Sequence, residues 1–179
     1  MPSPEGSSVT FRRVPASLRR APVERFARTL QKEVAKGRPF DILIAGDTEL
    51  RRLNRDFRGK DYPTDVLSFP SEPRRQAKAC PTTATLVGQA LACQRPPAGG
   101  PHLGDIAISL GRARAQAREF GHPIETELEI LMLHGVLHLC GHDHETDSGA
   151  MARAEKRWRA KLGLPTGLIE RVRAERVQE

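Results

Sequence analysis

Hydrophobic positions along the chain follow two spacings, one typical of helices and one typical of strands. Between residues 17 and 35, apolar side chains recur about once per helical turn, with arginine and glutamate between them. The run FDILIAG at 40–46 is continuously apolar and bounded by turn residues, which predicts a buried strand. The same criteria predict strands at 9–14, 65–69 and 103–110, and helices at 111–121, 123–140 and, with a cap at Asp147 or Ser148, up to 162. They also predict a helix at 47–58 that Asp47 caps, with Leu50, Leu53 and Phe57 on one face.

These elements predict an α+β fold, with a small mixed β-sheet of three to four strands packed with about five helices. The segment 9–14 would be the fourth strand and would lie at an edge. We expect residues 1–8 to be disordered, 9–165 to form a single domain and 166–179 to be a charged tail. Residues 71–102 are rich in proline and weakly periodic, so they are predicted to be a mobile insertion, with 85–93 as a possible short helix within it.

The amino-acid composition limits which cellular compartment and which classes of binding partner are expected. Aromatic residues make up only 4% of the chain, so the core should be aliphatic. No apolar run is long enough to span a membrane, the N-terminus lacks the apolar region of a signal peptide, and three cysteines without a CxxC motif argue against a disulfide framework. These features predict a cytoplasmic protein. The net charge of +7 favours a polyanionic partner such as nucleic acid, although arginine-rich usage in a GC-rich genome would produce the same excess.

Candidate chemistry concentrates in LHGVLHLCGHDHE at 133–145. His134 and His138 are four residues apart, so a helix places them on one face. Gly141 ends the predicted helix, which allows the chain to turn back and bring His144 to the same point. Three imidazoles form a zinc site with one position open for water, which is typical of catalytic zinc. The long helix therefore carries the predicted metal site, for one Zn²⁺ ion.

Other residues of this segment have alternative roles. Asp143 is equally well interpreted as an acceptor for a ligand imidazole or as a turn residue. Cys140 is interpreted as a small buried residue at the helix end. The spacing His-x3-His-x2-Gly-x2-His is also that of the metzincin peptidases, which carry a general-base Glu directly after the first His. Here that position is Gly135, which argues against a peptidase.

Two further stretches, RGKDYPTDVLSFP at 58–70 and LGDIAIS at 103–109, occur in that order ahead of the histidine block. Together the three blocks resemble the bacterial YbeY family. The resemblance spans about residues 40–160, apart from the insertion, which is longer than the family pattern. It implies a zinc-dependent, single-strand-specific endoribonuclease that acts in rRNA maturation, at the 3′ end of small-subunit rRNA, and in ribosome quality control.

The resemblance also assigns residues. His134, His138 and His144 match the zinc ligands, and Arg58 matches an arginine of the active-site cleft, so Arg58 and His134 are the predicted catalytic residues.

His142 falls where the family has Tyr or His and need not be a ligand. Ser68, in the SFP turn, and Asp105, in the GD pair, match the other two blocks. Expected partners are single-stranded RNA or rRNA and the ribosome or its small-subunit proteins, without a membrane. A non-catalytic, zinc-stabilised assembly factor and a metallopeptidase are the alternatives, and the sequence leaves open whether metal-bound water or the 2′-hydroxyl is the nucleophile.

Overall fold

Alternating apolar residues build a four-stranded mixed sheet. The computed structural model describes residues 6–71, 100–142 and 147–165. Its strands are β1 (Ser8–Phe11), β2 (Asp41–Ala45), β3 (Val66–Pro70) and β4 (Gly104–Ser109), in the order β1-β2-β4-β3. β1, β2 and β4 run parallel, and β3 pairs antiparallel with β4. The predicted mixed sheet is confirmed, and β1 lies at an edge as expected.

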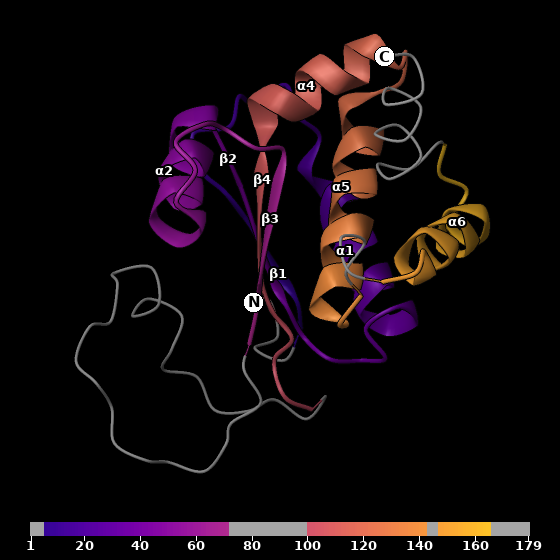
Figure 1. The fold of residues 1–179 in the computed structure, drawn as a ribbon. Coiled ribbons are helices and arrows are strands. Elements are labelled where there is room, and N and C mark those ends of the chain that lie inside the picture. Colours follow the sequence, from indigo (N-terminus) through magenta and orange to yellow (C-terminus); the bar gives the residue numbers. More distant parts are fainter. Residues whose placement is uncertain (1–5, 72–99, 143–146, 166–179) are drawn as a thin grey trace, which may run out of the picture.

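Five helices in the described part of the chain surround this sheet. They are α1 (Arg20–Glu33), α2 (Asp47–Arg58), α4 (Leu110–Glu119), α5 (Ile124–Leu139) and α6 (Ala150–Leu162). Figure 1 shows α1 and α5 on one side of the sheet and α2 on the other, with α6 outside α5. The predicted α+β class is confirmed, with helices alternating with strands along the chain.

The two faces of the sheet bury different amounts of apolar surface. Ile42, Ile106 and Ile108 point toward α1 and α5 and belong to the larger core. Their neighbours in sequence point the other way, because successive side chains of a strand alternate between faces. On that second face, the smaller core is made by α2 and by Ala45, Leu50, Leu53, Leu67 and Ala107.

Several element ends differ from the predictions. β1 begins at Ser8 and ends at Phe11, and α1 is shorter at both ends than 17–35. Asp47 is not the N-cap of α2: Gly46 occupies that position, and the Asp47 carboxylate instead accepts a hydrogen bond from Ser109 Oγ. The N-cap residue of α6 is Gly149, so neither Asp147 nor Ser148 occupies the predicted cap position. The Asp147 carboxylate nevertheless accepts hydrogen bonds from the backbone N–H groups of Gly149 and Met151, at 2.9 and 2.8 Å, at the start of this helix.

Some predictions concern residues outside the described ranges. These are the disorder of residues 1–5, most of the 71–102 insertion with its short helix at 85–93, and the tail at 166–179. Within the described ranges, no helix is both long and apolar enough to cross a membrane.

Candidate active site

Helix α5 places a buried histidine beside a partly buried one. The helix is apolar on nearly all sides and packs between the sheet, α1, α4 and α6, so its orientation is fixed by the core. His134 Nε2 and His138 Nε2 lie 3.2 Å apart, and His134 is 3% exposed. Two imidazole nitrogens bound to one tetrahedral zinc ion stand about 3.3 Å apart, given zinc–nitrogen distances of roughly 2.0–2.1 Å. The pair therefore fits two adjacent positions around one metal ion.

A carboxylate on α6 orients the first of these histidines. Glu155 is 1% exposed, and its Oε1 lies 3.3 Å from His134 Nδ1. If Nδ1 carries the ring proton, the Nδ1–H group donates a hydrogen bond to Glu155, and the lone pair of His134 Nε2 is left for a metal. Glu155 is not among the site residues predicted from the sequence. The available signal was a charged residue among the apolar positions of α6, on the same face as Met151.

The chain turns after α5 as predicted. Gly141 has φ of 90°, its N–H donates to His138 O at 2.9 Å, and the N–H of His142 donates to Leu137 O at 3.1 Å. Asp143 and His144 lie outside the described residues, so the third predicted ligand has no described position. Cys140 is the C-cap residue of α5 but is exposed, and its interpretation as a buried residue is wrong because it follows the last turn of the helix.

Gly135 explains why this site has no glutamate after the first histidine. A Cβ atom at position 135 would come within 2.9 Å of Ile106 Cγ2 on β4. The position therefore faces the sheet, and any side chain there would enter the packed core rather than the site. This geometry argues against the peptidase interpretation more strongly than the missing residue alone.

Ser68 connects the same part of α5 to the edge strand. Its hydroxyl donates to Gly135 O at 3.3 Å, so Ser68 contacts the residue next to His134. Ser68 lies within β3 and not in a turn, which corrects the expectation from the SFP motif, because Pro70 tolerates the last position of an edge strand.

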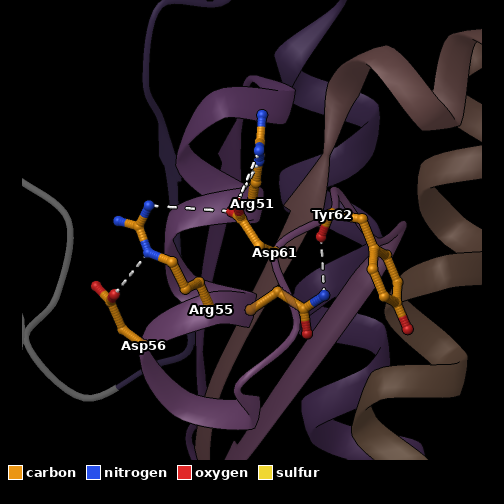
Figure 2. Close-up of polar contacts among 6 residues, drawn as sticks. Arg51, Arg55, Asp56, Asp61 and Tyr62 are labelled. Carbon is orange, nitrogen blue, oxygen red and sulfur yellow. Dashed lines mark hydrogen bonds and ion pairs between the residues drawn. The ribbon is translucent and has the colours of Figure 1, made fainter.

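Arg58 is the last residue of α2 and is exposed. Gly59 follows in the left-handed conformation with φ of 68° and ends the helix. Among the described residues, Arg58 has no hydrogen-bond or ion-pair partner. Its neighbours differ: Arg51 donates to both carboxylate oxygens of Asp61 at 2.8 Å, and Arg55 lies near the same carboxylate (Figure 2).

A hydrogen bond from a buried amide side chain stabilises the turn that follows Arg58. Asn54 is 1% exposed, and its Nδ2 donates to Tyr62 O at 2.8 Å (Figure 2). The hydrogen bond from Arg51 lowers the pKa of Asp61, so this carboxylate is held in its charged form. These contacts of Asp61 are those of a turn residue rather than of a base.

A second group of ligand-type residues lies on the other face of the sheet. Asp41, His102 and Asp105 each offer one atom within 4.8 Å of the others, so this group could hold a metal ion. Hydrogen bonds from His102 and Ser8 lower the pKa of Asp41, although burial alone would raise it. Burial raises the pKa of Asp105, with His102 opposing that rise and Asp41 adding to it. Of these three residues, only Asp105 lies in a sequence block that matches the YbeY family.

The chain is similar to a family of known proteins. A family model described as endoribonuclease YbeY matches residues 12–163. Proteins named endoribonuclease YbeY from Solibacter usitatus and Koribacter versatilis are 68% and 47% identical to the chain, over 97% and 73% of its length and 100% and 68% of theirs.

A solved structure has the same fold. The Thermotoga maritima protein TM1509 matches with a TM-score of 0.50 and 24% identity, covering 87% of this chain and 92% of the other. The family match covers most of the chain, and the Solibacter relative is similar over its full length. The chain therefore belongs to the endoribonuclease YbeY family.

Proposed function

We propose that this protein is a metal-dependent endoribonuclease that cleaves single-stranded RNA at the α5 histidines. The observation that carries the proposal is the 3.2 Å separation of His134 Nε2 and His138 Nε2 within a member of this family. His144 is the proposed third ligand, and one Zn²⁺ ion is the proposed metal. With three imidazoles, one coordination position stays available for water or substrate.

Each residue has a separate task in this proposal. When bound, zinc lowers the pKa of a coordinated water and polarises a phosphoryl oxygen. Glu155 keeps the proton of His134 on Nδ1, so that Nε2 faces the metal position. The hydrogen bond from Ser68 to Gly135 O, and the lack of a side chain at Gly135, set the distance between α5 and the sheet at Ile106.

Arg58 is the proposed phosphate-binding residue. Cleavage of a phosphodiester builds negative charge on the non-bridging oxygens, and a guanidinium binds two such oxygens at once. Arg51, Arg52 and Arg55 lie on the same helix but already contact carboxylates. The absence of such a contact for Arg58 among the described residues supports its assignment to the substrate.

RNA binding should depend mainly on phosphate contacts. The chain has one tyrosine and one tryptophan, so stacking surfaces for bases are few. Affinity should therefore fall steeply with salt, and the protein alone should show little base specificity. We propose that selection of the small-subunit rRNA 3′ end, and a role in ribosome quality control, come from contact with the ribosome or its small-subunit proteins in the cytoplasm.

The test is cleavage of a labelled single-stranded RNA by purified protein, beside His134→Ala and the same RNA in a duplex. We expect cleavage of the single strand by the wild type only, with loss of the α5 zinc ion in the variant. Equal cleavage by wild type and His134→Ala would contradict the proposal. A stoichiometric zinc ion without any cleavage would favour the assembly-factor alternative.

The products of the same reaction identify the nucleophile. Attack by water leaves a terminal monophosphate, whereas attack by the 2′-hydroxyl leaves a 2′,3′-cyclic phosphate. Replacing the 2′-hydroxyl at the cleaved position by hydrogen separates these routes, because only the second requires it.

A further inference from the structure

Three potential metal ligands converge at one end of the sheet, on the face opposite α5. Asp41 is the first residue of β2 and pairs in register with Asp105 of β4, while His102 lies two residues before β4. Ile42 and Ile106, the neighbours of the two aspartates, point into the core beneath α5. Strand alternation therefore directs both carboxylates to the other side, away from His134 and His138.

The spacing of the three side chains suits a single ion. His102 Nε2 lies 3.1 Å from Asp41 Oδ2, and all three candidate ligand atoms fall within 4.8 Å of one another. Ligands at about 2.0–2.2 Å from one ion stand roughly 3–4.3 Å apart. Small side-chain rotations would therefore close the group around an ion without any movement of the strands.

Two hydroxyls already orient the first two ligands. Ser8 Oγ donates to Asp41 Oδ1, which leaves Oδ2 directed toward His102. Ser71 Oγ lies 3.2 Å from His102 Nδ1. A metal ion would replace the proton that His102 Nε2 shares with Asp41, and Nδ1–H could then donate to this hydroxyl while the Nε2 lone pair faces the ion. Metal-binding imidazoles and carboxylates are characteristically oriented by such partners.

The third ligand has an unsatisfied oxygen. Asp105 Oδ1 is buried, and within the described residues it has no hydrogen-bond partner. A buried carboxylate oxygen without a donor is costly, and the nearby Asp41 carboxylate adds a second negative charge. A cation at the centre of the group would satisfy this oxygen and balance both carboxylates.

We propose that Asp41, His102 and Asp105 form a second metal site, which binds a divalent transition-metal ion such as Zn²⁺ or Mn²⁺. Imidazole together with carboxylates favours these ions over Mg²⁺ and Ca²⁺, which take oxygen ligands. Water would complete the coordination, since the His102 and Asp41 side chains remain 35% and 26% exposed. The ion would join β2, β4 and the segment that leads into β4, and so stabilise the folded state.

This proposal is independent of the proposed nuclease site, and the experiment separates the two. Full-length wild type and His138→Ala protein are stripped with chelator, equilibrated with Zn²⁺ or Mn²⁺, and analysed for bound metal per chain. His102→Gln is then introduced into both proteins. We expect it to remove one ion from each, and Asp105→Asn to do the same. Asp56→Asn, which changes an exposed aspartate on α2, should remove none.

Thermal unfolding provides a second readout in the His138→Ala protein. Saturating Zn²⁺ should raise the unfolding midpoint by about 5–10 °C, since an ion that binds only the folded state stabilises it. His102→Gln should abolish this shift. Unchanged metal content in both His102→Gln and Asp105→Asn would overturn the proposal. So would the absence of any bound ion in His138→Ala, because the second site should remain intact there.

Discussion

The two faces of the sheet hold their polar groups in different ways. On the α5 face, His134 is almost fully buried, and apolar packing on several sides fixes its helix. On the α2 face, the apolar core is small, and the charged groups of Asp41, His102, Arg51 and Asp61 are half-buried or exposed. Geometry is therefore set by packing on the first face, whereas on the second it depends on hydrogen bonds and ion pairs.

Because of this difference, we expect the two faces to differ in how well they tolerate amino-acid substitutions. The α5 helix is closely packed around the buried His134, so the α5 face should tolerate few substitutions. Exposed ion pairs contribute about 0–1 kcal/mol each, so the α2 face should tolerate most single substitutions. An exception is expected where a group on that face contacts substrate.

His138→Ala should have the largest effect. It removes one of two converging nitrogens, so we expect loss of bound zinc at α5 and a decrease in RNA cleavage of more than about 100-fold. The measurements are zinc content and the initial rate of cleavage. Lys161→Ala, which removes an exposed ion pair with Glu33, is the control and should behave as wild type. Retained cleavage in His138→Ala would place the active centre away from α5.

Arg58→Ala tests the expected exception on the α2 face. Loss of a charged contact to phosphate costs about 1.5–3 kcal/mol, so cleavage should fall roughly 10- to 150-fold, while zinc content and thermal stability stay near wild type. Arg52→Ala is the matched control, because Arg52 lies on the same helix but contacts Glu49 at 2.9 Å. Equal rates for the two variants would remove Arg58 from the site.

Glu155→Gln tests whether a carboxylate behind His134 supports the metal position. The amide keeps the size of the side chain but lacks the charge that favours a proton on Nδ1 of His134. We expect metal affinity to weaken about 10- to 100-fold. Competition with a chelator of known affinity measures this change, and cleavage at saturating zinc should recover in part. Unaltered affinity would reduce Glu155 to a packing residue.

Gly135→Ala should have the smallest effect on cleavage and a clear effect on stability. The added Cβ would meet Ile106 at 2.9 Å, and overpacking of this kind costs about 1–3 kcal/mol. Denaturant unfolding measures the change. Combining Gly135→Ala with Ile106→Ala should cost less than the sum of the two single changes, since the shortened side chain makes room for the methyl group. Strict additivity would show that the contact is not responsible.

Much of the fold followed from local patterns. The apolar runs at 40–46 and 103–110 became β2 and β4, and the glycines at 59 and 141 ended α2 and α5 with positive φ. The expectation for Asp47 failed because its carboxylate contacts Ser109, which is far away in sequence. Phe57 shares a helix face with Leu50 and Leu53 but is 51% exposed, since it lies at the end of α2, beyond the small core.

The residues of the candidate sites also fall into those that local sequence spacing predicts and those that it does not. His134 and His138 are four residues apart on one helix, so their proximity follows from helical geometry, which the sequence by itself determines. Glu155, Ser68 and the group of Asp41, His102 and Asp105 come from separate elements, and only the tertiary structure brings them together. The physical reason is that spacing along a chain specifies contacts within a helix or strand, whereas contacts between elements depend on strand order, register and packing.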